Sequence, residues 1–436
     1  MAEEPPVDPE EERFAAEART AGLVLPPPKR FGLENIAVAF AISVLIVGAS
    51  IVIGHAEGWF NPVRPTESGP DLQGPQDCGG GPASVPLNLA VESNASVALT
   101  AGWENLTSLY VTGTGDCVVA STSAGGMASL TSFSADGLIG PDLSLSASYA
   151  ALGTKTYAVP LLVSPVVVVY NLEGSDAGLN LSAAALAGAY LGSISSWTSP
   201  QLTATNPGLD SSLPVTPIEL GGPSQANEVF SSYLAEWNAS FRTEVGAGWQ
   251  PPWPAGLAAA SPSALLSLVA GTPGAIGYEP TDVCPSLPSN VSCARVETGN
   301  ASFVTPSFAG TWEAANATLS SSAVTSGAWV NDTGVTPTTS TAYPMVEVTG
   351  GLLYRDLGSA YGGSLGLNQA QWLMSMFWWI GSAIGTTVVG SGYYALPSGF
   401  TVAVETVLAK VAYDGTSILF PNGEENGETG NETGEF

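Results

Sequence analysis

Four residues, Gly221-Gly222-Pro223-Ser224, separate a predicted strand over residues 214–220 from an apolar pattern at helical spacing that follows at once. A strand that ends in glycines and opens a helix directs backbone N–H groups and the positive end of the helix dipole to one place. This arrangement favours an anion or a polar ligand. Many α/β proteins contain such a corner without a ligand, so the spacing alone leaves a purely structural role open.

A resemblance to a known family rests on several short motifs that occur in one order. Residues 187–219 contain AGAYLGSISSWTSPQL, NPG and LPVTPIE, and a serine-containing loop and a Tyr-Leu helix follow. This order resembles the phosphate-binding proteins of ABC transporters. VPLLVSPVVVVYNL at 159–172, GTPGAIGY at 271–278, YP at 343–344 and GYYALP at 392–397 resemble further motifs of that family. The resemblance runs from residue 86 to residue 412, and it implies a two-lobed α/β type II periplasmic-binding-protein fold with two hinge crossovers.

The resemblance also implies a ligand set drawn from three loops and one turn. The family's first loop falls on residues 93–96, its glycine-rich loop on 122–126 and its third loop on 220–227. Its acidic residue, which accepts a hydrogen bond from the anion's proton, falls on Asp142. For Ser123 and Asp142 a helix cap and a turn are the alternative roles. The implied ligands are Ser93, Asn94, Ala95, Ser123, Asp142, Ser224, Gln225, Ala226 and Asn227.

The third loop departs from the family. Leu220 stands where the family has its ligand Arg, and Gly222 stands where it has the partner Asp. Gln225 and Ala226 replace a Gly and a Thr, so only Ser224 is retained. A bidentate Arg is the strongest single contact to phosphate. We therefore expect a neutral polar cleft that holds an oxyanion more weakly than the family norm, or a different solute.

Length and composition restrict the remaining possibilities. With 436 residues, 45% hydrophobic and 11% charged, the chain has room for two lobes and can form cores. Its net charge of −28 argues against nucleic acid and anionic membrane surfaces as partners. Residues 1–35 are acidic and proline-rich in their first part and are predicted to be a disordered cytoplasmic segment.

Residues 36–54 form an uncharged apolar run of 19 residues. As a helix the run spans roughly 28 Å, close to the hydrocarbon thickness of a membrane. A cleavable signal peptide is the alternative, but its apolar part is usually about 7–15 residues long and follows a short basic start. We predict a retained transmembrane anchor, with Lys29 and Arg30 on the cytoplasmic side. Residues 55–85 then form a tether.

Sequons and cysteines lie only beyond the predicted anchor. The four cysteines predict two disulfides, Cys284 with Cys293 across a short turn and Cys78 with Cys117, and a zinc site is the alternative. The sequons predict an exported glycoprotein. They are at Asn94, Asn105, Asn180, Asn238, Asn290, Asn300, Asn316, Asn331 and Asn431.

The folded body divides into segments that the two crossovers define. Val159–Leu172 is a continuous apolar run and predicts a strand buried on both faces. The run WLMSMFWWIG at 372–381 is too short to span a membrane and predicts a core helix. The predicted order is lobe 1 at 86–160, lobe 2 at 161–342, the rest of lobe 1 at 343–420, and a disordered acidic tail at 421–436.

No catalytic site is expected. Gly362–Gly366 matches G-x-S-x-G, but the single histidine, His55, lies at the membrane edge, so no Ser–His triad can form. No residue spacing indicates a catalytic metal or a cofactor. We therefore expect a monomeric, membrane-anchored extracytoplasmic protein that captures phosphate or a related oxyanion for an ABC permease in the same membrane. The alternative is a degenerate binding module that acts as a sensor or surface-interaction protein for another ligand, including an uncharged one.

Overall fold

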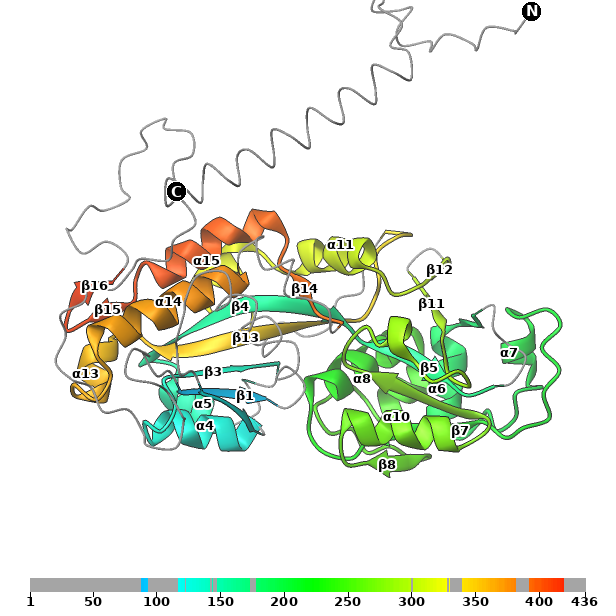
Figure 1. The fold of residues 1–436 in the computed structure, drawn as a ribbon. Coiled ribbons are helices and arrows are strands. Elements are labelled where there is room, and N and C mark those ends of the chain that lie inside the picture. The colour runs from blue at the N-terminus through cyan, green and yellow to red at the C-terminus, as the bar shows by residue number, and fades with distance from the viewer. Residues whose placement is uncertain are drawn as a thin grey trace, which may run out of the picture. The chain divides into compact units, whose positions relative to one another are not determined.

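The chain forms a mixed α/β fold with two separate hydrophobic cores (Figure 1). The computed structural model describes residues 88–92, 117–121, 123–141, 143, 147–172, 178–298, 301–327, 329, 339–381 and 392–418. All of them belong to one compact unit, Pro62–Asn431. The predicted α/β class is confirmed.

The first core is built on a six-stranded sheet in the order β14-β4-β13-β3-β1-β2. β1 is parallel to β2 and β3, whereas β13 is antiparallel to β3 and β4. The C-terminal ends of the parallel strands therefore meet at one edge, which is where ligand loops are usual in α/β folds. The strands are β1 Asn88–Glu92, β2 Cys117–Ser121, β3 Gly137–Gly140, β4 Thr156–Pro165, β13 Val346–Tyr354 and β14 Tyr394–Ala395.

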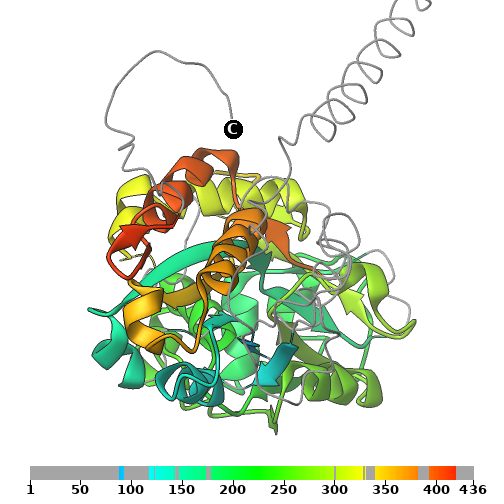
Figure 2. The ribbon, with the colours of Figure 1, turned by 60° about the vertical axis from the view of Figure 1, so that its left-hand side comes forward.

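Helices α14 and α15 lie together on β4 in both views of the ribbon, and α4 packs on β1 and β3 (Figures 1 and 2). Phe377 of α14 packs so closely on β13 that a side chain at Gly351 would lie 2.3 Å from its ring. Leu373 and Phe377 are fully buried, so the apolar run at 372–381 is a core helix, as predicted. The helices are α4 Ser123–Thr131, α5 Ala147–Leu152, α11 Phe308–Thr318, α12 Ser321–Ser326, α13 Leu357–Tyr361, α14 Leu367–Gly381 and α15 Thr401–Leu408.

The second core is built on a five-stranded sheet in the order β10-β5-β9-β7-β8. β7 is parallel to β8 and β9, and β5 is antiparallel to β9 and β10. The strands are β5 Val167–Tyr170, β7 Thr216–Leu220, β8 Leu257–Ala259, β9 Ala275–Glu279 and β10 Ser292–Cys293. The helices are α6 Ala183–Tyr190, α7 Pro200–Thr203, α8 Gln225–Trp237, α9 Ala239–Glu244 and α10 Pro262–Gly271.

Two small sheets complete the described part. One has the order β12-β11-β6 and the other pairs β15 with β16. Short 3₁₀ turns cover Cys284–Ser286 and Ser398–Phe400. The strands are β6 Asn180–Leu181, β11 Arg295–Glu297, β12 Phe303–Val304, β15 Ala412–Tyr413 and β16 Thr416–Ser417.

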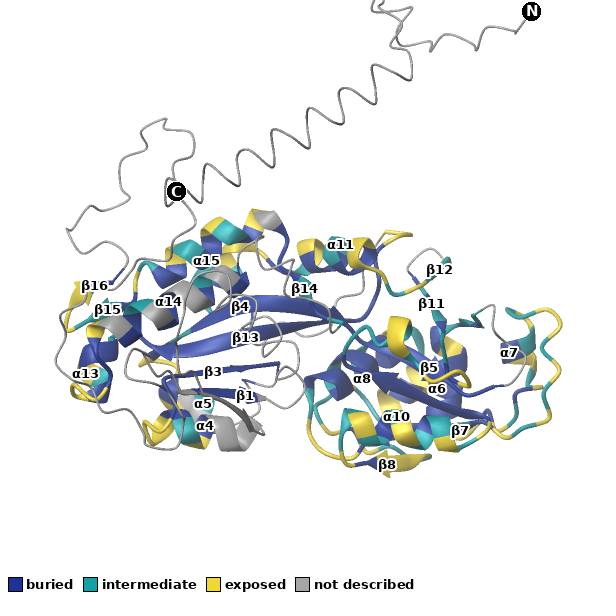
Figure 3. Cartoon of the chain, viewed as in Figure 1, coloured by how far each residue is buried: buried dark blue, intermediate teal, exposed yellow. Residues whose placement is uncertain are grey.

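The predicted crossover strand, Val159–Leu172, is buried along its whole length, but it is two strands in two sheets (Figure 3). β4 ends at Pro165 and β5 begins at Val167. Between them, the Val166 N–H donates to Met345 O at 2.9 Å, and the Val166 carbonyl accepts from the Tyr343 hydroxyl at 3.1 Å. Tyr343 and Met345, at the second crossover between the two cores, thus hydrogen-bond to the first crossover at Val166, where the chain changes sheets.

The predicted cytoplasmic segment, anchor, tether and acidic tail lie outside the described residues. Among the helices that the structure describes, none is long and apolar enough to cross a membrane. The anchor at 36–54 and the lobe boundaries therefore stay predictions.

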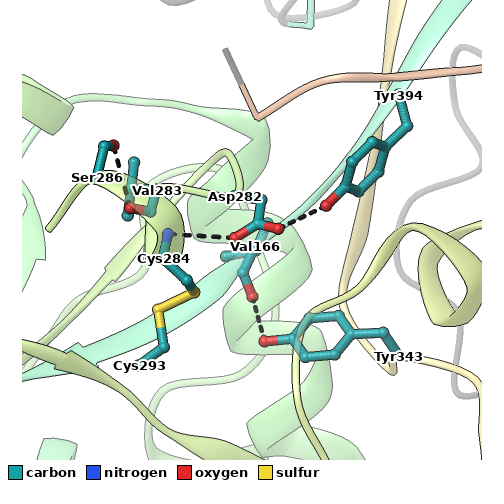
Figure 4. The surroundings of a disulfide bond; sticks show 8 residues. All are labelled: Val166, Asp282, Val283, Cys284, Ser286, Cys293, Tyr343 and Tyr394. Atoms are coloured by element: carbon teal, nitrogen blue, oxygen red, sulfur yellow. Dashed lines mark hydrogen bonds between the residues drawn. A yellow bond between two sulfur atoms is a disulfide. The ribbon is translucent and has the colours of Figure 1, made fainter. Parts of the chain in front are cut away.

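The Cys284–Cys293 disulfide is present, as predicted, with Cα atoms 5.7 Å apart (Figure 4). Cys78 lies outside the described residues, so its pairing with Cys117 remains a prediction. Non-reducing peptide mapping of the chain is expected to recover two linked pairs, because oxidised export compartments preserve both bonds. A free Cys117 thiol, or Cys117 linked to Cys284, would contradict this pairing.

Candidate functional site

The corner between β7 and α8 has the geometry that the sequence predicts. β7 ends at Leu220 and α8 begins at Gln225. Ser224 is the N-cap of α8, and its hydroxyl accepts from the Asn227 N–H at 3.1 Å. Its own N–H donates to Trp249 O at 3.0 Å. The N–H of Ala226 lies in the same turn and is not used by this cap.

The side chain of Asn227 is fully buried and holds the loop through hydrogen bonds. Its amide nitrogen donates to the carbonyl oxygens of Leu220 at 3.1 Å, Gly222 at 2.8 Å and Trp249 at 3.0 Å. Its amide oxygen accepts from the Tyr278 hydroxyl, which in turn accepts from the Leu220 N–H at 3.2 Å. The Asn227 side chain is therefore committed to loop structure, and its backbone N–H is used by the Ser224 cap.

Tyr278 stays protonated in this network. Burial is the main cause that raises the pKa of its hydroxyl far above the ordinary value of 10.0, and the Leu220 N–H, which stabilises the phenolate, opposes this only in part. The hydroxyl therefore remains a donor to Asn227 over the whole physiological range. Its ring stacks on Phe230 of α8 with centroids 4.3 Å apart, which fixes the helix against β9.

Gln225 links the start of α8 to the first core. With its nitrogen turned toward them, the side-chain amide donates to Val348 O on β13 at 3.3 Å and to Pro141 O at 3.2 Å. Pro141 follows β3 and immediately precedes Asp142 in the chain. The third predicted ligand loop therefore lies within hydrogen-bond distance of Pro141, the residue before the predicted acidic ligand.

The remaining predicted ligands are only partly located. Ser123 is the first residue of α4, and β2 ends two positions before it at Ser121, so a second strand-to-helix corner exists where the sequence predicts one. Nothing is described of the Ser123 side chain. Ser93, Asn94, Ala95 and Asp142 lie outside the described residues. Whether these residues contact a ligand stays a prediction.

The structure also shows where the two departing residues of the third loop lie. Leu220, which stands at the family's Arg position, is 5% exposed and packs in the second core. An Arg at this position would bury its charge among apolar side chains. At Gly222, in contrast, an added Cβ would meet no atom within 4 Å. Gly222 is thus a position of the loop that can accept a charged side chain.

The cations whose contacts are described serve the scaffold. Arg242 donates to Ala235 O at 2.7 Å and Glu236 O at 2.6 Å, at the C-terminal end of α8. Arg355 donates to Thr156 O at 3.0 Å and lies over the Tyr157 ring. These contacts place neither Arg242 nor Arg355 at the start of α8. Glu219 is an acidic residue of β7 near the corner between β7 and α8. Burial is the largest cause and raises the pKa of its carboxyl from the ordinary value.

The G-x-S-x-G match is a turn between α13 and α14. Gly362 and Gly363 have φ values of 59° and 86°, and the Ser364 hydroxyl donates to Tyr361 O at 2.7 Å. His55 lies outside the described residues. Among those that are described, no group of three or more His, Cys, Asp or Glu side chains is placed to hold a metal ion.

A second junction between the two cores lies beside the disulfide (Figure 4). Asp282 accepts hydrogen bonds from the Tyr394 hydroxyl and, at 3.2 Å, from the Cys284 N–H. The Asp282 N–H donates to Gly392 O at 3.1 Å, and a side chain at Gly392 would collide with the Asp282 backbone. The sequence motif GYYALP contains Gly392 and Tyr394, but nothing in the motif predicts that Asp282 is their partner.

Comparisons with known proteins agree with this architecture. A family model described as "PBP superfamily domain" matches residues 86–375. The phosphate-binding protein PstS of Xylella fastidiosa is 31% identical over 152 residues, which are 34% of this chain and 41% of that protein. PstS of Methanocaldococcus jannaschii is 28% identical over 167 residues, 36% of this chain and 42% of that protein. The aligned parts thus span less than half the length of these relatives.

Solved structures show the same fold. A high affinity periplasmic phosphate-binding protein in complex with phosphate aligns with a TM-score of 0.53 and 17% identity, over 74% of this chain and 93% of the other. An ancestral soluble variant of the human phosphate binding protein aligns with a TM-score of 0.54 and 16% identity, again over 74% and 93%. At identities this low, the likeness shows only that the fold is shared.

Proposed function

The chain belongs to the PBP superfamily, and from this premise we propose that it captures phosphate or a related oxyanion outside the cell and delivers it to an ABC permease. The observation that carries the proposal is the capped start of α8, whose Gln225 reaches Pro141 of the first core. Helix N-termini bind anions through backbone N–H groups and the helix dipole. The relatives and structural neighbours bear names of phosphate-binding proteins, which supports this choice of ligand.

The proposed binding mode uses hydrogen bonds without a cationic side chain in the third loop. The backbone N–H of Ala226 and the loops that carry Ser93, Ser123 and Asp142 would surround the anion. A charge-assisted hydrogen bond contributes about 1.5–3 kcal/mol. Since the loop lacks the family's Arg, we expect an affinity about one to two decades below that of a site that has it.

The proposed setting is the outer face of the cell membrane. Residues 36–54 would anchor the chain as a single helix, with the bulk extracytoplasmic, so that a monomer delivers its ligand to the permease in the same membrane. The disulfide supports an oxidising, exported location.

Calorimetry of the purified chain with phosphate, sulfate and molybdate tests the proposal. Heat of binding with at least one of these oxyanions is the expected result. If none binds at millimolar concentration, the alternative applies, in which the cleft serves a sensor or surface-interaction protein for another solute. The replacement of the family's Arg and Asp by Leu220 and Gly222 is the observation that favours that alternative.

Gly222→Arg is expected to tighten oxyanion binding by about 10- to 100-fold, because it adds a charge-assisted contact two residues before the Ser224 cap. The matched control is Gly271→Arg, at the C-terminal end of α10. A Cβ there also meets no atom within 4 Å, and the variant adds the same net charge at the negative end of a helix dipole. Equal tightening by both variants would contradict a site at the start of α8.

A further inference from the structure

We propose that Asn290 is an acceptor of an N-linked oligosaccharide, and that the sequons at Asn180, Asn238 and Asn316 are closed to this modification in the folded chain. These are the four sequons that lie within the described residues. The proposal concerns a modification and is independent of which solute the protein binds.

The transferring enzyme must reach two groups of a sequon at once, the Asn amide and the hydroxyl two residues later. In an extended chain, residues i and i+2 point to the same side, whereas in an α-helix they do not face each other. A folded sequon is therefore readable where its Asn is exposed and lies outside helices, and it is unreadable inside a helix or where its hydroxyl is engaged.

Asn180 is held by hydrogen bonds of its amide nitrogen and its backbone. Its amide nitrogen donates to Thr205 O at 3.2 Å, and its carbonyl accepts from the Thr205 hydroxyl at 2.8 Å and the Asn206 amide at 2.9 Å. The hydroxyl of this sequon, on Ser182, caps α6 by accepting from the Ala185 N–H at 3.1 Å. Glycosylation would require β6 to leave its sheet.

Asn238 and Asn316 are held in helical structure. Asn238 ends α8 and caps α9, where its side-chain oxygen accepts from the Phe241 N–H at 2.9 Å. Asn316 is exposed but lies inside α11, and the hydroxyl of its sequon, on Thr318, donates to Ala314 O at 2.9 Å. Both sequons need unwinding before an enzyme can read them.

Asn290 meets the requirements. Residues 288–290 are exposed and lie outside helices and strands, in a turn closed by the Val291 N–H donating to Pro288 O at 2.9 Å. The chain then enters β10 at Ser292, so both groups of this sequon lie outside helices. The Cys284–Cys293 disulfide closes the loop that presents this turn. It also indicates the exported, oxidising environment in which N-glycosylation occurs.

In the transfer step, the amide nitrogen of Asn290 forms a bond to the anomeric carbon of the first sugar. The bond from that carbon to the phosphate oxygen of a lipid-linked oligosaccharide breaks, and the lipid phosphate leaves with the electron pair. The nitrogen releases one proton and keeps the other. Its hydrogen bond to Ala270 O, 2.7 Å in the unmodified chain, can therefore persist in the product.

The test uses the folded, disulfide-bonded full chain, a single-subunit oligosaccharyltransferase that accepts N-x-S/T, and a lipid-linked oligosaccharide. Glycopeptide mass spectrometry then reports occupancy at each sequon. Synthetic peptides that span the four sequons correct for the enzyme's own preference. We expect modification of Asn290 at a rate close to that of its peptide. The corrected rates at the other three should be at least about tenfold lower, because each needs a local opening of the fold.

Two variants sharpen the outcome. Ser292→Ala keeps Asn290 but should abolish its modification, and Ser292→Thr should restore it. An unmodified Asn290 whose peptide is modified would overturn the proposal. So would a corrected rate at Asn180 equal to that at Asn290.

Discussion

Asn227→Asp is expected to destabilise the second core by at least about 3 kcal/mol, because the change replaces a donor with an acceptor that faces three carbonyl oxygens. The Asn227 amide nitrogen lies 2.8–3.1 Å from the carbonyls of Leu220, Gly222 and Trp249. Each buried group left unpaired costs about 1–3 kcal/mol, and a carboxylate at a fully buried position adds a desolvation cost. The free energy of urea unfolding, followed by tryptophan fluorescence of the second core, measures the loss.

Asn238→Asp is the matched control for this change. The substitution is the same, but Asn238 acts as an acceptor at the N-cap of α9, a role that Asp fills equally well. Its unfolding free energy should therefore stay within about 0.5 kcal/mol of the natural chain. Equal stability of both variants would mean that the Asn227 network does not hold the loop. In that case the binding corner would need another support.

Much of the corner could be predicted from the sequence, because local patterns determine it. The glycines, the serine cap and the apolar spacing of α8 predict a strand, a loop and a helix, and the structure has them at Thr216–Leu220 and Gln225–Trp237. The motif resemblance predicted the fold, and the family match confirms it. The local disulfide was predictable for the same reason, since nine positions separate its cysteines.

What the sequence did not predict depends on partners distant in the chain. Asn227 looked like a candidate ligand, and only the positions of Trp249 and Tyr278 show that its side chain is committed to the loop. The sequence predicted that this apolar run crosses between lobes, but not the residue at which it changes sheet, which the contacts of Val166 with Tyr343 and Met345 define. Leu220 was aligned with a ligand Arg by counting, and its burial shows that this position points into the core.

The contact between the two cores beside the disulfide likewise depends on residues that are distant in the chain. Glu279 ends β9, and Pro280, Thr281 and Asp282 lead from it to the contact with Tyr394 of the first core. The Pro280 carbonyl accepts from the Ser164 hydroxyl of β4 at 2.9 Å. A change in the charge of Glu279 therefore acts on the segment that connects the two cores.

Glu279 is expected to make the fold less stable as the pH rises from 5 to 9. It is 3% exposed, and burial raises the pKa of its carboxyl from 4.5 to about 8, with a hydrogen bond to the Leu266 backbone opposing this. Between these values the folded chain keeps a proton that the unfolded chain has released. The stabilisation by the neutral form is therefore complete below about pH 4.5 and is lost by about pH 8. A pKa difference of this size corresponds to about 3–5 kcal/mol.

Glu279→Gln removes this loss, because its side chain is neutral at every pH. Its unfolding free energy relative to the natural chain should rise by about 3–5 kcal/mol between pH 4.5 and pH 8.5. Urea unfolding at a series of pH values measures the change. Glu244→Gln, at an exposed position of α9, is the control and should leave the slope of the natural chain unaltered. Parallel profiles for the natural chain and Glu279→Gln would show that Glu279 is already ionised in the fold, and would assign any alkaline loss of stability to another group.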